Sequence, residues 1–134
     1  MTARPDEVYH YTCKCWVPKI GAQQQVRPAV HAILRHHGRF VWLTDLPEPN
    51  PVAAGLPVVR VPCDRSQFRV AIDGALPNVH RWASWSRRNL PLQLRQAVEV
   101  NDPKALFAHW WIALGAVPIL RIDDMRIPLD KEPR

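Results

Sequence analysis

Three neighbouring side chains near the start of the chain have types and spacing suited to binding a small polar ligand. His10, Tyr11 and Thr12 lie in a segment, residues 7–12, whose aromatic and β-branched residues favour a strand. On a strand His10 and Thr12 share a face, with side chains roughly 7 Å apart. An imidazole and a hydroxyl at that separation can hydrogen-bond a sugar or an amide. The structural alternative is a partly buried histidine bonded to the backbone.

A second set of side chains lies at the end of the clearest strand, residues 40–44. Trp42 and Thr44 share a face there, and Asp45 follows. An aromatic ring beside a hydroxyl can stack against a flat ligand ring and orient it. Residues 46–57 are rich in proline and predict a long loop, a kind of segment that is often functional. The structural alternative is a core tryptophan and a strand-end threonine.

Arginines next to the following strand offer phosphate ligands. Arg65 precedes the strand expected at residues 68–72, and Arg69 lies within it. A guanidinium can bind a phosphate through two hydrogen bonds. The structural alternative is a surface turn in which Asp64 pairs with Arg65, an interaction worth little.

The cysteines do not have the spacing of a metal site. A zinc site needs four thiolate or imidazole ligands, and a C-x-C pair with one distant cysteine is not a zinc-finger pattern. We therefore predict no metal and expect structural thiols, with no bond between the two cysteines of the C-x-C pair. An odd number of cysteines fits a reducing compartment, so we expect a cytoplasmic protein. The residues weighed are Cys13, Cys15 and Cys63, with His10, His36 and His37.

A segment rich in tryptophan and arginine, residues 80–88, allows two interpretations. Aromatic rings interleaved with arginines can stack on bases and bind phosphates. The alternative, which we favour, places Trp82 and Trp85 in the core with arginine stems covering them.

The elements that must position these residues alternate irregularly between strand and helix. After Pro28, the apolar spacing predicts a helix that Gly38 ends, and the spacing over residues 90–100 predicts a second, amphipathic helix. Asp73 and Gly74 predict a turn. The tail from Asp123 is expected to fray. Strands are expected at residues 7–12, 40–44, 58–61, 68–72, 110–114 and 117–122. The pattern indicates an α+β domain with a largely antiparallel sheet, a single domain over residues 1–134 with an ordered core of about 8–122.

Composition narrows the classes of protein further. With 14 prolines in 134 residues, long uninterrupted helices and coiled coils are excluded. The longest apolar run, residues 110–120, is too short to span a bilayer, so we expect no membrane partner. The net charge is +6, from 18 lysines and arginines against 12 acidic residues, which favours anionic partners or simply reflects an arginine-rich chain. No nucleophile elbow, glycine-rich phosphate loop or metalloprotease motif is present.

The order of these segments resembles the small ADP-ribosyltransferase-like fold. It is most similar to the branch that contains the DNA-modifying DarT-type toxins and related small actinobacterial and phage proteins. The resemblance spans most of residues 8–122, and the opening Y-H-x-T strand is its most telling part. It is carried by Tyr9-His10-Tyr11-Thr12, Val26-Arg27-Pro28, Val41-Trp42-Leu43-Thr44-Asp45, Trp110-Trp111-Ile112 and Val117-Pro118.

This resemblance implies a fold of two small facing sheets with NAD bound in the cleft between them. It implies that His10 hydrogen-bonds the nicotinamide ribose with help from Thr12, and that Trp42 and Thr44 flank the nicotinamide. Tyr11, in the same strand, is counted among the cofactor-binding residues. An arginine grips the diphosphate in this family, and the candidates here are Arg27, Arg65 and Arg69.

The chain departs from the family pattern at the catalytic acid. The family's transferases carry a glutamate near the start of a late strand, where it stabilises the positive charge that develops as nicotinamide leaves. The matching stretch here, residues 108–112, contains no acid. Glu99 is the best substitute and Asp64 another, so the predicted catalytic residues are His10 and Glu99.

These observations lead to three functional hypotheses. The first is an NAD-dependent ADP-ribosyltransferase-like protein that modifies a macromolecular acceptor, a nucleic acid or a protein, in the manner of a toxin or an antidefence protein. The second is a catalytically inactive nucleotide- or partner-binding protein of the same fold, which the missing late-strand acid motivates. The third is a basic nucleic-acid-binding module, motivated by a pI near 9.8 and by residues 80–88.

Overall fold

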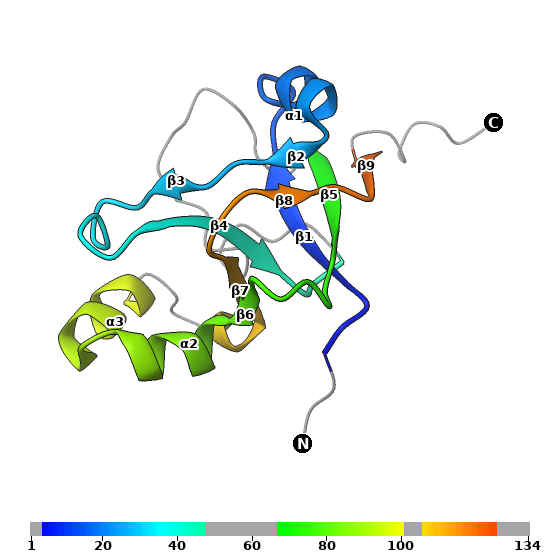
Figure 1. The fold of residues 1–134 in the computed structure, drawn as a ribbon. Coiled ribbons are helices and arrows are strands. Elements are labelled where there is room, and N and C mark those ends of the chain that lie inside the picture. Colours follow the sequence, from blue (N-terminus) through cyan, green and yellow to red (C-terminus); the bar gives the residue numbers. More distant parts are fainter. Residues whose placement is uncertain (1–3, 48–66, 101–105, 126–134) are drawn as a thin grey trace.

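A computed structural model describes residues 4–47, 67–100 and 106–125 of the chain, and most of its strands belong to one sheet (Figure 1). The strands are β1 (Glu7–Thr12), β2 (Gln25–Val26), β3 (Ala29–Val30), β4 (Arg39–Thr44), β5 (Phe68–Asp73), β6 (Val79–Arg81), β7 (Trp110–Ala113), β8 (Val117–Pro118) and β9 (Arg121–Asp124). The helices are α1 (Val17–Gln23), α2 (Trp82–Asn89) and α3 (Leu92–Glu99), with a single 3₁₀ turn, η1 (Leu106–His109).

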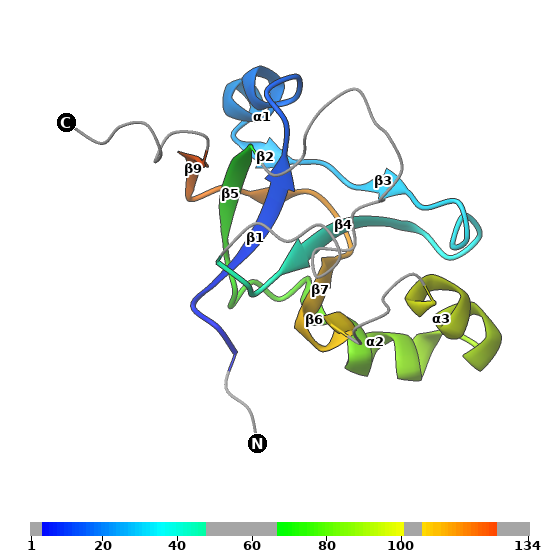
Figure 2. The same cartoon turned by 180° about the vertical axis from the view of Figure 1, so that it is seen from behind.

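The large sheet has seven strands in the spatial order β6-β7-β4-β1-β5-β9, with β3 beside β4, and every pairing in it is antiparallel. A second, two-stranded sheet pairs β2 with β8. Both views place α2 and α3 beside β6 and β7, and α1 near β2 (Figures 1 and 2). The α+β class with a mostly antiparallel sheet, predicted from the sequence, is thus confirmed.

The strand register assigns each side chain to one of the two faces of the large sheet. Paired residues share a face, and successive residues alternate. Tyr9 pairs with Thr44, and Thr44 pairs with Trp110, so these three side chains share one face. His10 and Leu43 therefore point to the other.

The face that carries Leu43, here called the aliphatic face, is covered by α1 and the small sheet. Ile20 of α1, Val26 of β2 and Val117 of β8 pack onto it. Fully burying one such side chain contributes about 1.5–3 kcal/mol, so these contacts hold the small sheet in place. The strand residues of this cluster are Val8, Val41, Leu43, Val70, Ile72, Val79, Trp111 and Ala113.

The opposite face, here called the aromatic face, is covered by α2 and α3 where β4, β6 and β7 lie. Trp82 of α2 is fully buried and its ring centroid lies 5.2 Å from that of Trp42. The amphipathic helix predicted at residues 90–100 is confirmed as α3, which directs Val98 into this cluster. The cluster consists of Leu34, Phe40, Trp82, Trp85, Leu90, Val98, Trp110 and Ile112, with Trp42, Leu94 and Phe107 against it.

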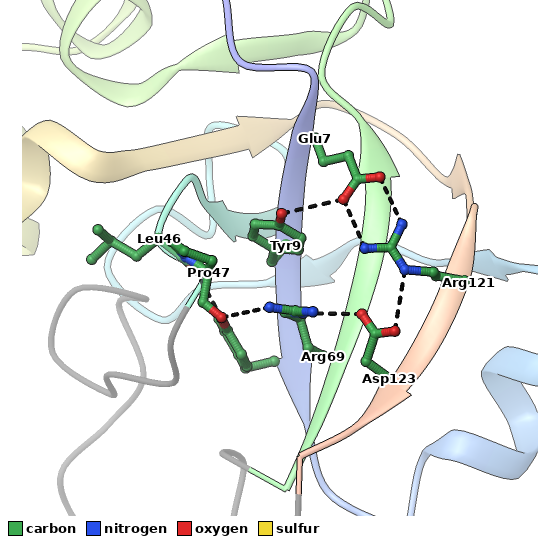
Figure 3. A network of polar contacts seen from close by, with 8 residues as sticks. Glu7, Tyr9, Leu46, Pro47, Arg69, Arg121 and Asp123 are labelled. Carbon is green, nitrogen blue, oxygen red and sulfur yellow. Dashed lines mark hydrogen bonds and ion pairs between the residues drawn. The ribbon is translucent and has the colours of Figure 1, made fainter. Parts of the chain in front are cut away.

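Over β1, β5 and β9 the aromatic face carries a chain of charged side chains instead (Figure 3). Arg121 bonds both oxygens of Glu7, at 2.6 and 2.9 Å, and Asp123 at 3.1 Å. Asp123 also binds Arg69 at 3.0 Å, and Tyr9 donates to Glu7 at 3.2 Å. The Arg121 guanidinium lowers the pKa of Glu7, and the pair raises the pKa of Arg121. Burial, followed by the bond to Glu7, raises the pKa of Tyr9.

Several expected elements differ in the structure. The helix predicted after Pro28 is wrong: Ala29 and Val30 form β3, and a turn follows until Gly38, whose φ of 117° suits only glycine. Pairing of β3 with β4 overrides the helical spacing there. No element was predicted over residues 17–23, where α1 forms with Pro18 in its first turn, a position that proline suits.

The end of the chain differs as well. The strand expected at residues 117–122 is divided into β8 and β9, which belong to different sheets. The tail expected to fray from Asp123 continues as strand through Asp124, because β9 pairs with β5. The strand expected at residues 58–61 lies outside the described residues. The expected strands at 7–12, 40–44, 68–72 and 110–114 are confirmed as β1, β4, β5 and β7, and the turn at Asp73-Gly74 forms.

The cysteines differ from the expectation of free thiols. Cys13 and Cys15 are both disulfide-bonded, the first buried and the second exposed. The prediction was wrong for these two residues because spacing along the chain does not report which sulfur atoms meet in the fold. Cys63 lies outside the described residues.

Two features are absent from residues 4–47, 67–100 and 106–125. No group of three or more potential metal ligands occurs there. None of the helices there is long and apolar enough to cross a membrane.

Candidate functional site

The ladder of the large sheet opens between its two central strands. β1 pairs with β5 along its whole length, from Glu7 with Asp73 to Thr12 with Phe68. It pairs with β4 only at Tyr9 and Thr44. Antiparallel counting would next pair His10 with Leu43 and Tyr11 with Trp42, but β1 and β4 form neither pair. The two strands thus diverge beyond Tyr9.

His10 lies at this opening. Its Nδ1 is 3.1 Å from the main-chain carbonyl oxygen of Trp42, the group that would face β1 in a continued ladder. A carbonyl oxygen only accepts, so the imidazole donates through Nδ1 and its neutral form carries no proton on Nε2. The side chain is half-buried. The imidazole therefore replaces a ladder bond and holds the two strands at the point where they part.

The other predicted residues of β1 are buried. Thr12 is 4 % exposed and shares the aliphatic face with His10, as the sequence predicts. Tyr11 is 2 % exposed and its hydroxyl donates to the Leu46 carbonyl at 2.8 Å. Of the three neighbours singled out in the sequence, His10 is the most accessible.

The residues predicted in β4 lie on the other face. Thr44 is buried, and its hydroxyl accepts the Leu46 N–H at 3.2 Å. Trp42 is half-buried, and its ring packs against those of Trp82 and His31, with centroids 5.2 and 5.4 Å away. The structure thus joins His10 to the backbone of Trp42, while the Trp42 ring and Thr44 face away from His10 and Thr12. Burial lowers the pKa of His31, which keeps this ring neutral at pH 7.

The predicted catalytic acid, Glu99, has a partner in the aromatic cluster. It is the last residue of α3, and its Oε2 accepts the indole N–H of Trp82 at 2.7 Å. Because Trp82 is fully buried, this carboxylate satisfies a donor that water does not reach. The structure therefore gives Glu99 a role in packing α2 against α3.

The arginines proposed for a diphosphate have different surroundings. Arg69 donates to Asp123 at 3.0 Å and to the Pro47 carbonyl at 2.6 Å, with its guanidinium 4.9 Å from the centre of the Tyr9 ring (Figure 3). Arg27 is exposed between β2 and β3. Arg65 and Asp64 lie outside the described residues. Arg69 is engaged in the sheet, whereas Arg27 is open to an anion.

The Trp- and Arg-rich segment supports the core interpretation. Trp82 is fully buried and Trp85 is 9 % exposed, so neither indole offers a face for stacking on a base. Arg87 and Arg88 are exposed in the last turn of α2. The part of the nucleic-acid hypothesis that rests on phosphate contacts stays a prediction.

Reasoning from the sequence missed a second polar group, at the end of β4. Asp45 accepts hydrogen bonds from His109 at 2.8 Å and from the indole of Trp111 at 3.1 Å. Residues 108–112 contain no acid, but the fold brings Asp45, the residue after β4, against His109 and Trp111. The available signals were Asp45 directly after one predicted strand and His109 directly before another. The sequence did not show that these two strands pair.

Comparisons of the chain with protein-family models, with curated proteins and with solved structures find no match.

Proposed function

We propose that this protein is ADP-ribosyltransferase-like and binds NAD at the opening between β1 and β4. The observation that carries the proposal is the divergence of these strands beyond Tyr9 and Thr44, with the His10 imidazole bonded to the Trp42 carbonyl. The resemblance assigns to His10 a bond to the nicotinamide ribose. His10 is half-buried, so part of its side chain reaches the surface where the strands diverge.

The proposed reaction is transfer of ADP-ribose from NAD to a macromolecular acceptor. Nicotinamide leaves from the anomeric carbon of the ribose as the acceptor attacks it. His10 orients the ribose in this scheme, and the net charge of +6 attracts an anionic cofactor.

A second candidate function is binding of NAD without turnover. The observation that favours it is the bond from the Trp82 indole to Glu99, which gives that carboxylate a packing role. Losing one charge-stabilising group typically lowers the rate by about 10²–10³-fold. Only a measurement of NAD turnover can therefore distinguish a slow enzyme from a protein that binds NAD without turnover.

The test is a one-dimensional proton NMR time course of NAD with the purified protein. Released nicotinamide supports transfer or hydrolysis, and broadened NAD lines without nicotinamide support the binder. An unchanged spectrum overturns both and gives the nucleic-acid hypothesis first place.

Two asparagine variants distinguish a role of His10 in ligand binding from its role in holding β1 against β4. His10→Asn keeps a side-chain N–H for the Trp42 carbonyl but removes the ring, and we expect it to fold and to lose NAD binding. His37→Asn, at an exposed turn, is the matched control and should bind as wild type. Wild-type binding by a folded His10→Asn protein would contradict the assigned site.

A further inference from the structure

The junction of β4 and β7 brings three polar side chains together on the aliphatic side of the sheet. Because Thr44 pairs with Trp110, Asp45 lies opposite His109, and Trp111 shares the face of His109. The Asp45 N–H donates to the His109 carbonyl at 3.2 Å, which continues the ladder by one bond. Backbone pairing thus fixes the two residues relative to each other.

Both oxygens of the Asp45 carboxylate accept a hydrogen bond. Oδ1 accepts from His109 Nδ1 at 2.8 Å, and Oδ2 accepts from Trp111 Nε1 at 3.1 Å. The Trp111 side chain is buried, so its N–H holds the carboxylate in one orientation. A carboxylate can only accept, so the neutral imidazole carries its proton on Nδ1 and a lone pair on Nε2.

The imidazole is accessible while the carboxylate is partly covered. The His109 side chain is 41 % exposed and that of Asp45 is 21 % exposed. A histidine whose Nδ1–H is held by a carboxylate, with its ring reaching solvent, is the arrangement that makes imidazole a general base.

Among the described residues, two guanidinium groups lie over the Trp111 ring. Arg81 of β6 donates to the Ala108 carbonyl at 3.4 Å and stacks over the Trp111 ring at 4.6 Å. Arg4 lies over the same ring at 5.6 Å. These guanidinium groups favour an anionic molecule beside His109.

We propose that His109 is the general base that activates the acceptor in the transfer reaction, with Asp45 as its positioning residue. This inference rests on the proposed function, which supplies the electrophile. His109 Nε2 takes the proton from a hydroxyl or amine of the acceptor as that atom bonds to the anomeric carbon of NAD. The bond from this carbon to nicotinamide breaks, its electron pair neutralises the pyridinium nitrogen, and His109 later gives the proton to water.

The first test needs no NAD and measures the His109 tautomer by ¹⁵N NMR. We expect the Nδ1–H form in the wild type. In Asp45→Asn the single amide oxygen is needed by the Trp111 indole, so the amide N–H₂ faces His109 and selects the Nε2–H form. Adding Trp111→Phe frees the oxygen and should restore the Nδ1–H form. An Nε2–H imidazole in the wild type would overturn the proposal.

The second test measures nicotinamide release from NAD under single-turnover conditions across pH. We expect His109→Gln to lower the rate by about 10²–10⁴-fold and to remove the ionisation of a base from the pH profile. His36→Gln, at an exposed turn, is the control and should match the wild type. Each variant is first checked for wild-type thermal unfolding.

The two proposals fail in different ways. If the wild type releases nicotinamide and a folded His109→Gln protein does so equally fast, the general-base assignment is wrong and the proposed function stands. If the wild type releases none, the transfer reaction is wrong, and the base assigned to it falls with it.

Discussion

At the scale of single residues, one carboxylate shows how packing competes with chemistry for the same side chain. Glu99 is predicted as a catalytic acid because few glutamates are available, yet its oxygen accepts the N–H of the buried Trp82. His10 also has a structural bond, to the Trp42 carbonyl, but its side chain is half-buried rather than enclosed. Residue type alone does not separate these two outcomes.

The role of Glu99 in packing can be measured directly. Glu99→Ala leaves the Trp82 indole N–H unsatisfied, and we expect it to lower the free energy of unfolding by about 1–3 kcal/mol. Glu99→Gln keeps an acceptor oxygen and should cost less. Urea denaturation followed by tryptophan fluorescence gives both values. Equal, negligible costs for the two variants would show that the hydrogen bond is unimportant for stability.

At the scale of elements, turns and ion pairs decide how the strands are held. Gly74 follows β5, and its N–H donates to the Asp6 carbonyl at 2.9 Å. The Arg4 guanidinium donates to the Gly74 and Val79 carbonyls on the same side. On the far edge, Arg121 of β9 reaches across β5 to Glu7 of β1 (Figure 3). These contacts connect the start of the chain to strands far along the sequence.

A methyl group at Gly74 should disrupt the first of these connections. An added Cβ would lie 2.2 Å from the Pro5 carbonyl oxygen, so the N-terminal segment would have to move. We expect Gly74→Ala to lower stability by about 1–3 kcal/mol in denaturant unfolding.

The matched control for this change is Gly21→Ala in α1. Its Cβ would meet only Ile122 Cδ1, at 3.9 Å, and alanine favours a helix interior. This variant should be neutral or more stable. A loss at Gly21 as large as at Gly74 would contradict the steric explanation.

The ion pairs over β1, β5 and β9 predict a dependence of stability on acid. The folded-state pKa of Glu7 lies below its ordinary value of 4.5, with the hydrogen bond from Arg121 as the largest cause. Stabilisation by Glu7 is therefore complete above pH 4.5 and is lost as the pH falls below 4.5 through the folded pKa.

Thermal unfolding of Glu7→Gln as a function of pH tests this expectation. The melting temperature of the variant should fall less steeply below pH 4.5 than that of the wild type, because it lacks this ionisation. Asp6→Asn changes an exposed neighbour and is the control. Parallel curves for wild type and Glu7→Gln would contradict the prediction.

At the scale of the whole molecule, one sheet separates two cores of different character. The aliphatic face packs on α1 and the small sheet, and the aromatic face packs on α2 and α3. Four of the six tryptophans, Trp42, Trp82, Trp85 and Trp110, lie in the aromatic cluster. Because both cores share the strands β4 and β7, we expect them to unfold together.

A cavity on one face tests this coupling. Val70 is fully buried in the aliphatic cluster, and Val70→Ala should lower stability by about 2 kcal/mol. Circular dichroism reports the whole fold, whereas fluorescence reports mainly the aromatic face. We expect the same shift of the midpoint with both probes. A shift in circular dichroism alone would show that the two cores unfold separately.

Several features were determined by the sequence alone because their causes are local. Alternating β-branched and aromatic residues predicted β1, β4, β5 and β7, and apolar spacing predicted α3. The tryptophans of α2 were expected in the core and lie there. The helix predicted after Pro28 failed because pairing of β3 with β4 is a contact between elements that local spacing does not report.

Only the tertiary structure decided which strands pair, and with that the composition of the site. His10 lies where the pairing of β1 with β4 stops. That position depends on the pairing of β1 with β5 and of β4 with β7 as well. The meeting of Asp45 with His109 and Trp111, about 65 positions away, depends on the register of β4 against β7. Hydrogen-bond partners in a sheet are set by packing of the whole chain. The sequence therefore shows which chemical groups are present, and the fold determines which of them lie in contact.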